Sequence, residues 1–146
     1  MTSACTHLKH FQSTTKRTSK MILDAVGIVC GDLKESQRFY NLLGLQFQQA
    51  GGPEHVEATT TTGLRLMLDS EALMKKINPD FVKPTGSGMT LGFKQDSVAG
   101  VNEVYDTVIK SGFVGTKAPY DAFWGQRYAS IQDPDGNPID LFADLN

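Results

Sequence analysis

The segment DPDGN, residues 133–137, places side-chain oxygens in a spacing that some calcium-binding loops use. Asp133, Asp135 and Asn137 would occupy the first, third and fifth positions of such a loop, and Asp144 the twelfth. That loop also needs glycine at its sixth position, which here is Pro138, and a bidentate glutamate at its twelfth. The sequence therefore argues against a calcium loop and leaves two alternatives, a hairpin turn and the rim of a pocket.

A hairpin turn suits the same five residues. Pro134 presets a negative φ, while Gly136 and Asn137 tolerate a positive φ, and strand-like segments flank both sides. We predict that DPDGN is a turn that sets the register of the strand after it. On this hypothesis the pocket is formed by the strands and not by the loop.

Other catalytic chemistry finds little support in the sequence. His55 is the only histidine after residue 20, and no serine or cysteine accompanies it in a recognisable nucleophile motif. It is therefore expected to be a surface or edge residue. No basic patch favours binding to nucleic acid, and no apolar run is long enough to predict a membrane span.

Charge divides the chain into two parts. Residues 1–20 form a basic, Ser/Thr-rich extension without any acid, so all 16 acidic residues lie in residues 21–146. The extension has the composition of a transit peptide, but we favour an appendage or an upstream start, because Met21 opens a strand-like segment. The acidic remainder favours cationic small molecules as partners. Cys5 and Cys30 stand in contrasting contexts, which indicates a reducing, cytoplasmic location rather than a disulfide.

The elements that would position a site follow a plan that occurs twice. Each repeat has a strand, then a helical segment that ends at a glycine (Gly44 or Gly112), and then three short strands. The predicted strands are near 21–29, 46–49, 55–61, 64–69, 89–95, 115–119, 126–132 and 138–143, and the predicted helices are 31–44 and 96–112. Repeat one spans about 21–70, a linker about 71–87, and repeat two about 88–146. This pattern predicts an α+β protein of tandem βαβββ modules with mainly antiparallel sheets.

Two segments carry a family resemblance. VCGDLKESQRFYNLLGL, residues 29–45, and WGQRYASIQDPDGNPIDL, residues 124–141, resemble the glyoxalase, bleomycin-resistance and extradiol-dioxygenase superfamily, also called vicinal oxygen chelate proteins. The second segment is most similar to the bleomycin-resistance branch. The resemblance covers about residues 21–146 and implies a curved, eight-stranded cup with helices outside, often completed by dimerisation. A homodimer is therefore expected.

The resemblance also implies where a metal would bind in metal-using members. These place a histidine or glutamate on the first and last strand of each module, and the corresponding positions here are Ala25, Arg65, Met89 and Asp140. Only Asp140 could bind a divalent cation, because alanine has no donor, a thioether is soft and a guanidinium is a permanent cation. We therefore expect no metal and no other cofactor.

The expected ligand site lies inside this cup. Arg65 and Asp140 would face each other, either as a structural ion pair or as contacts to a ligand. Trp124 would stand at the rim, where an indole can stack on a flat or cationic molecule. The remaining candidates are aromatic or apolar side chains on predicted inner faces: Met67, Met89, Phe93, Phe123, Tyr128 and Phe142.

Two functions remain open at this point. The first is metal-independent sequestration of a cationic or aromatic small molecule, such as an antibiotic. The alternative is a metal-independent or atypical-metal lyase, isomerase or dioxygenase-like enzyme that acts on a small metabolite, with Asp140, Tyr128 or Arg65 as acid, base or electrostatic stabiliser.

Overall fold

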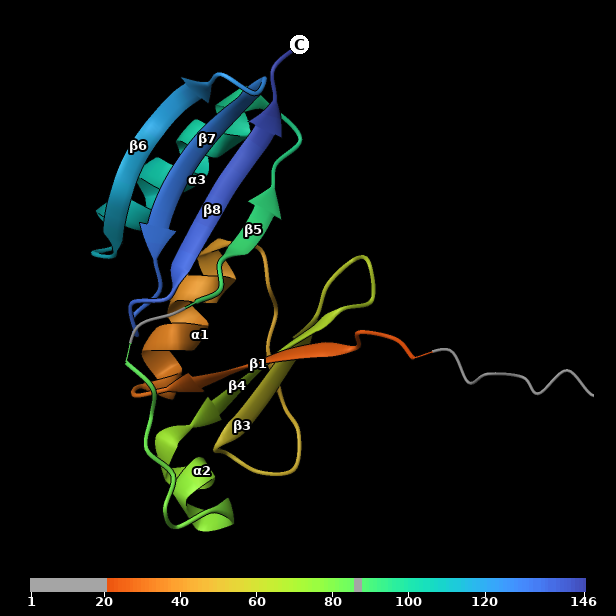
Figure 1. Ribbon diagram of the computed structural model, residues 1–146, viewed down its shortest axis with the longest axis vertical. Coiled ribbons are helices and arrows are strands. Elements are labelled where there is room, and N and C mark those ends of the chain that lie inside the picture. Colours follow the sequence, from red (N-terminus) through yellow and green to blue (C-terminus); the bar gives the residue numbers. More distant parts are fainter. Residues whose placement is uncertain (1–20, 86–87) are drawn as a thin grey trace, which may run out of the picture.

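Two four-stranded sheets, one from each half of the chain, carry the fold (Figure 1). The computed structural model describes residues 21–85 and 88–146, so the basic extension at residues 1–20 lies outside the described residues. Sheet A has the strand order β1-β4-β3-β2, and sheet B has the order β5-β8-β7-β6. In each sheet the first-named pair is parallel and the other pairs are antiparallel.

The elements follow the expected repeated plan, which confirms the α+β fold class. The expected eight strands are present as two open sheets. The bounds are β1 (Ala25–Cys30), α1 (Leu33–Leu42), β2 (Gln48–Gln49), β3 (His55–Thr59), β4 (Arg65–Ser70), α2 (Glu71–Ile77), β5 (Leu91–Lys94), α3 (Val98–Lys110), β6 (Val114–Ala122), β7 (Gln126–Gln132) and β8 (Pro138–Asp144).

Two strands begin later than their apolar patterns predict. β1 begins at Ala25 because Met21, Ile22 and Leu23 are exposed and have no partner strand among the described residues. β5 begins at Leu91, which leaves Met89 outside the strand. Apolar character alone therefore placed both strand starts too early.

Capping side chains and glycines set the ends of the two long helices. The Asp32 carboxylate accepts the Glu35 N–H at the start of α1, and the Ser97 hydroxyl accepts the Gly100 N–H at the start of α3. Gly44 and Gly112 each follow a helix end with a φ of 90°, a conformation that glycine adopts without strain. Both expected helix stops are confirmed.

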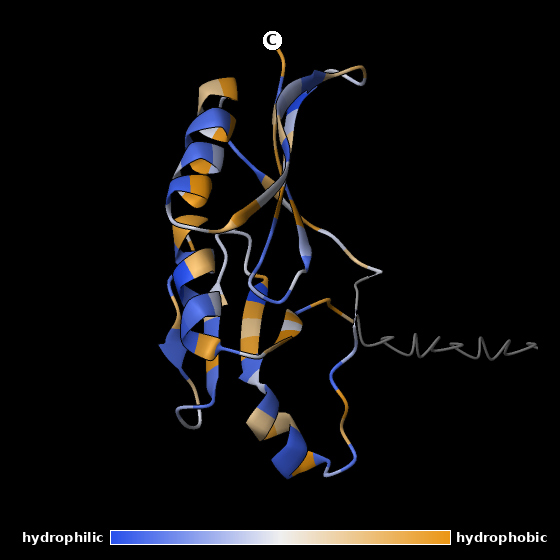
Figure 2. Ribbon diagram, turned by 90° about the vertical axis from the view of Figure 1, so that its left-hand side faces the viewer, coloured by the Kyte–Doolittle hydropathy of each residue, from blue (hydrophilic) through white to orange (hydrophobic). Residues whose placement is uncertain are grey.

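The two helices bury one face each against the sheets. Phe39 and Tyr40 of α1 and Val101 and Val108 of α3 are fully buried, and they join one continuous apolar core. Figure 2 shows α1 and α3 one above the other along one side of the molecule. Within the part of the chain that the structure describes, no helix has the length and apolar character needed to cross a bilayer.

The DPDGN segment forms the expected hairpin turn, and it also ties the two repeats together. Asp133 is only 4% exposed, and its carboxylate accepts the Tyr40 hydroxyl of α1 at 2.7 Å. Three donors from its own loop complete the set: the Asp135 N–H, the Asn137 N–H and the Asn137 side-chain amide. A buried carboxylate is tolerated only when it is hydrogen-bonded in this way. We call this contact the Tyr40–Asp133 clamp.

Asp135, two residues later in the loop, strengthens the same junction. Its carboxylate accepts the Gly31 N–H at 2.9 Å and the Ser36 hydroxyl at 3.3 Å, and it forms an ion pair with Lys83. The loop between β7 and β8 of repeat two is therefore bonded to the segment between β1 and α1 of repeat one. This contact fixes how the two halves of the chain meet.

Tyr40→Phe tests the clamp. Loss of the buried hydroxyl should lower the free energy of unfolding by about 1–3 kcal/mol, because a buried carboxylate loses one of its donors. Tyr105→Phe is the matched control, since Tyr105 holds the equivalent helix position in repeat two and donates no hydrogen bond in the described structure. Its effect should stay within about 0.5 kcal/mol. Urea unfolding of both variants gives the comparison, and equal losses would contradict the clamp.

Candidate functional site

Each sheet has one face that none of the described helices covers, which we call its open face. On β4, Leu66 and Leu68 are buried on the helix side, so Arg65 and Met67 lie on the open face of sheet A. On β8, Ile139 and Leu141 are buried on the helix side. Asp140 and Phe142 therefore lie on the open face of sheet B, as their sequence spacing predicts.

Aromatic rings gather at one end of sheet B, and we call them the aromatic wall: Tyr120, Phe123, Trp124, Tyr128 and Phe142. Tyr128 stacks on Phe142 with ring centroids 5.9 Å apart, and Trp124 meets Tyr128 edge to face at 5.3 Å. Phe123 is 98% exposed and Trp124 is 49% exposed. Large rings left in solvent beside ordered rings are typical of an interaction surface.

Asp140 lies beside this wall and is held by two hydroxyls. The Tyr128 phenol donates to one carboxylate oxygen at 2.9 Å, and the Ser130 hydroxyl donates to the other at 2.8 Å. Burial raises the pKa of Tyr128 to about 12, and the hydrogen bond to Asp140 adds to this increase. The phenol therefore stays protonated at neutral pH and acts as a donor.

The expected pairing of Arg65 with Asp140 is wrong within one chain. Arg65 donates instead to Glu57 at 2.7 Å and to Asp24 at 2.7 Å, both on its own half of the chain. The two residues belong to different sheets, and neighbours in the same half satisfy each of them. Period-two alternation identified the face of each residue, but it contained no information on how the two sheets are oriented.

Strand register also shows that Asp140 of repeat two corresponds to a different residue of repeat one than the sequence predicts. Asp140 lies opposite Gly92 across the β5–β8 ladder, and Met67 lies opposite Gly27 across the β1–β4 ladder. Gly27 precedes the start of α1 by the same number of residues as Gly92 precedes the start of α3, so the two glycines hold equivalent positions in the two repeats. Met67, and not Arg65, is therefore the counterpart of Asp140.

Two further candidates lie away from the aromatic wall. Phe93 pairs with Leu141 and packs against the core on the helix side, so its expected inner-face position is wrong. Gly92 has the open-face position instead, and the Phe142 ring lies 3.2 Å from where a Cβ would stand. Met89 precedes β5 and lines a different cavity. The structure thus groups Phe123, Trp124, Tyr128, Asp140 and Phe142.

The four register positions do not suit the metal that the resemblance implies. Glycine at 27 and 92 offers no side-chain donor, the Met67 thioether is soft, and both oxygens of Asp140 already accept hydrogen bonds. Within residues 21–85 and 88–146, no three His, Cys, Asp or Glu side chains are close enough to hold a metal ion. No reaction step is therefore assigned to a metal at these positions.

The sequence did not predict that the DPDGN loop forms one wall of a cavity. Asp135 and Asn137 line a cavity of about 310 Å³ at the junction of the two repeats, together with β1 and the segment before β5. The prediction that strands form the ligand pocket concerned the open faces and stays a prediction, but this second cavity has the loop as one wall. The alternating polar residues of the loop were a usable signal, but their partner, the edge of β1, is about a hundred residues away in sequence.

His55 lies within a row of charges on the open face of sheet A. Its Nδ1 is 2.5 Å from Asp69 and its Nε2 is 3.4 Å from Glu57, which also accepts from Arg65. The hydrogen bond to Asp69 raises the pKa of His55 above its ordinary value, and Glu57 contributes in the same direction. Because carboxylates face both ring nitrogens, His55 is poorly placed to act as a general base.

This row predicts a pH dependence of stability. A raised folded-state pKa stabilises the protein fully below the ordinary histidine pKa of about 6.5, and that contribution is lost as pH rises through the folded-state value. The stability difference between wild type and His55→Gln should therefore be largest in mild acid and should shrink at higher pH. Denaturant unfolding at a series of pH values, from mild acid to above the folded-state pKa, measures this stability difference. A difference that does not change with pH would mean that His55 gains nothing from its carboxylates.

Comparisons with known proteins agree with this geometry. The family model described as Glyoxalase/Bleomycin resistance protein/Dioxygenase superfamily matches residues 22–141. No curated protein matches the sequence. A glyoxalase/bleomycin resistance protein/dioxygenase family enzyme from Burkholderia phytofirmans PsJN is 23% identical, with a TM-score of 0.73 and coverage of 84% of this chain and 98% of that one.

Two more solved structures have the same fold. A glyoxalase-related enzyme from Fulvimarina pelagi has a TM-score of 0.75 at 17% identity, covering 86% of this chain and 89% of that one. A lactoylglutathione lyase from Agrobacterium tumefaciens has a TM-score of 0.62 at 18% identity, covering 88% and 96%. These likenesses establish the fold, and the family model covers most of the described residues. The chain therefore belongs to the glyoxalase, bleomycin-resistance protein and dioxygenase superfamily.

Proposed function

We propose that the open face of sheet B binds a flat, cationic aromatic small molecule and holds it without chemical change. The observation that supports this most directly is the aromatic wall beside the carboxylate of Asp140. Rings bind a flat ligand through their faces and edges, and a nearby carboxylate supplies the charge opposite to a cation. Sequestration of an antibiotic of this chemistry, as in the bleomycin-resistance branch, belongs to the same proposal.

The wall already accommodates a cation. The Lys117 ammonium lies 4.1 Å from the centre of the Tyr120 ring, so the electrostatics of this surface favour positive charge. The Trp124 indole donates to Gln126 at 2.9 Å, which orients its ring before any ligand arrives. A pre-oriented ring loses less conformational entropy on binding than a mobile one. Both features support binding without a large rearrangement.

The second candidate is a metal-independent enzyme, and the Tyr128–Asp140–Ser130 network is the observation that favours it. Both hydroxyls donate to Asp140 and orient its carboxylate, which could act as a general base or stabilise positive charge that develops in a reaction. The raised pKa of Tyr128 makes the phenol a donor and an unfavourable base at neutral pH. Recovery of a bound ligand unchanged after long incubation supports sequestration, and conversion of that ligand supports the enzyme.

The proposal includes a cytoplasmic homodimer. In it, the open face of sheet A from a second copy, with Met67 and Arg65, closes over the aromatic wall. Both open faces lie outside the helix-covered core, so each is available for such a contact. The buried free thiol of Cys30, whose pKa burial raises to about 11, is compatible with a reducing compartment.

Trp124→Ala tests the aromatic wall with proflavine, a planar aromatic cation, as the probe. The substitution should weaken binding by about 1–3 kcal/mol while the protein remains folded, because Trp124 is half exposed. Titration calorimetry and quenching of Trp124 fluorescence in the wild type measure the effect. Ile77→Ala removes another exposed apolar side chain far from the wall and should leave affinity unchanged. Equal affinity in the Trp124 variant would exclude the wall as the site.

Asp140→Asn tests the counter-charge. It should weaken proflavine binding by about 1 kcal/mol, as expected for a partly exposed charge pair, and the loss should shrink at high salt. Asp144→Asn is the matched control, because Asp144 lies on the same strand and face but pairs with Lys94. If both variants lose affinity equally, the effect is one of overall charge. If an identified substrate is no longer converted by Asp140→Asn, the enzyme alternative gains support.

A further inference from the structure

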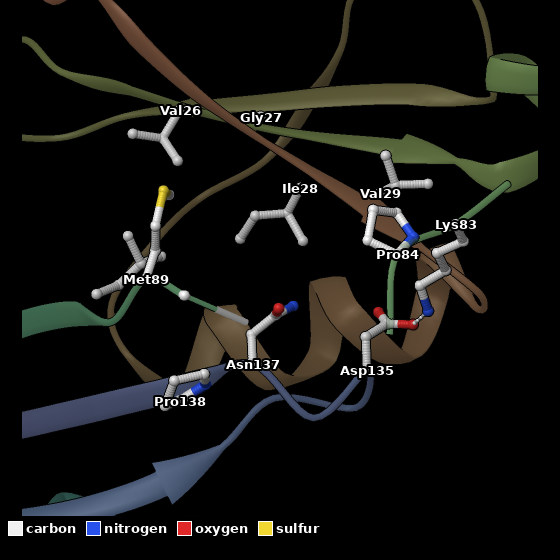
Figure 3. Close-up of a pocket in the computed structure, with 12 residues that line it drawn as sticks. Val26, Gly27, Ile28, Val29, Lys83, Pro84, Met89, Asp135, Asn137 and Pro138 are labelled. Atoms are coloured by element: carbon white, nitrogen blue, oxygen red, sulfur yellow. Dashed lines mark hydrogen bonds and ion pairs between the residues drawn. The ribbon is translucent and has the colours of Figure 1, made fainter. Parts of the chain in front are cut away.

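The cavity at the junction of the two repeats is separate from the aromatic wall. Its volume is about 310 Å³, at the lower end of the range for small-molecule pockets. Most of its lining is apolar: Val26, Ile28, Pro84, Met89, Leu91 and Pro138. Figure 3 shows Lys83 and Asp135 pointing toward each other on one side, with Asn137 beside them and Val26, Ile28 and Met89 around the remaining space.

One wall of this cavity is the edge of β1, whose backbone has unused hydrogen-bonding groups. Among the described residues, β1 is the end strand of sheet A and pairs only with β4. The Arg65 N–H donates to the Asp24 carbonyl, so the groups of Asp24, Val26 and Ile28 point toward β4. By alternation, the N–H and C=O groups of Gly27 and Val29 point toward the cavity. Both residues line it.

The next residue of the same alternation shows what such a group can bind. Gly31 N–H also points away from β4, and it donates to the Asp135 carboxylate at 2.9 Å. The side of β1 that faces repeat two thus already binds one acceptor oxygen. Val29 N–H is the neighbouring donor along the same edge, and within the described structure no hydrogen bond satisfies it.

Charge in the cavity is already balanced, which disfavours an ionic ligand. Asp135 forms an ion pair with Lys83, and this pairing raises the pKa of the Lys83 ammonium. A ligand carboxylate would compete with Asp135, and a ligand ammonium would compete with Lys83. An uncharged ligand avoids both costs and can use the remaining N–H groups of Lys83.

We propose that this junction cavity binds an uncharged, mainly apolar lactam, which pairs its cis-amide with the edge of β1. A cis-amide presents its C=O and its N–H on the same side. It can therefore accept from the Val29 N–H while it donates to the Val29 or Gly27 carbonyl. A trans-amide presents the two groups on opposite sides and can use only one of them against a single strand edge. The apolar body of the lactam fills the space beside Val26, Ile28 and Leu91.

Oxindole and N-methyloxindole form a matched pair of probes for the wild-type protein. Both have the same apolar ring system and the same carbonyl, but only oxindole has the N–H. Oxindole should cause saturable shifts in the amide signals of Gly27 and Val29 in nitrogen-15 NMR spectra. N-methyloxindole should bind about tenfold more weakly, because it leaves a strand carbonyl without its donor.

Val29→Pro removes the edge donor without removing a bond to β4, since proline is tolerated where the N–H of an edge strand faces away from the sheet. It should weaken oxindole binding by about tenfold. Val29→Ala keeps the N–H, shortens the side chain and should retain the preference for oxindole. If Val29→Pro does not fold, the affinities of oxindole and N-methyloxindole for the wild-type protein still test the proposal.

Three results would overturn the proposal. These are equal binding of oxindole and N-methyloxindole, absence of saturable shifts at Gly27 and Val29, or oxindole-dependent shifts confined to Tyr128 and Trp124 on the aromatic wall. The last result would assign oxindole to the surface of the proposed function. Binding of proflavine to that wall is measured separately, so either site can fail without the other.

Discussion

The buried carboxylate of Asp133 is the constraint on which the arrangement of the molecule depends. Four donors surround it, and one of them, the Tyr40 hydroxyl, comes from the other repeat. A carboxylate in this environment is costly unless every donor is present, so the two halves of the chain must meet in one geometry. Burial and the carboxylate of Asp133 raise the pKa of Tyr40 well above its ordinary value, which keeps the phenol a donor.

That geometry determines which surfaces are left for ligands. Helices α1 and α3 cover one face of the sheets and leave the open faces uncovered, so the aromatic wall is not part of the core. The same junction brings the DPDGN loop beside the edge of β1 and encloses the cavity there. The two candidate sites therefore have different chemical character: one has rings and a carboxylate on a sheet face, and the other has backbone groups at a strand edge.

Local pattern was sufficient to predict the elements, because alternation and helical spacing act over a few residues. It identified both helices, their glycine stops and the faces of Asp140 and Phe142. It failed where the answer depends on distant segments. Arg65 was matched with Asp140 by fitting the metal positions of the resembling family to the last strand of each repeat, but the register across each sheet makes Met67 the counterpart. Phe93 was assigned to the inner face because Met89, which has the same parity, was taken as an inner position, whereas register pairs Phe93 with the buried Leu141 on the helix side.

The Tyr40–Asp133 clamp has no equivalent contact in the opposite direction, from repeat two to repeat one, among the described residues. Tyr40 and Tyr105 hold equivalent positions on the two helices, but only Tyr40 reaches a carboxylate. The turn between β3 and β4, the counterpart of DPDGN, is built from threonines and a glycine and offers no acid. Two identical ancestral repeats would have had either both contacts or neither. The present halves are no longer interchangeable: the first supplies the tyrosine and the second supplies the aspartate. Neither half by itself completes the buried hydrogen-bond set, so the two repeats depend on each other and form one cooperative unit.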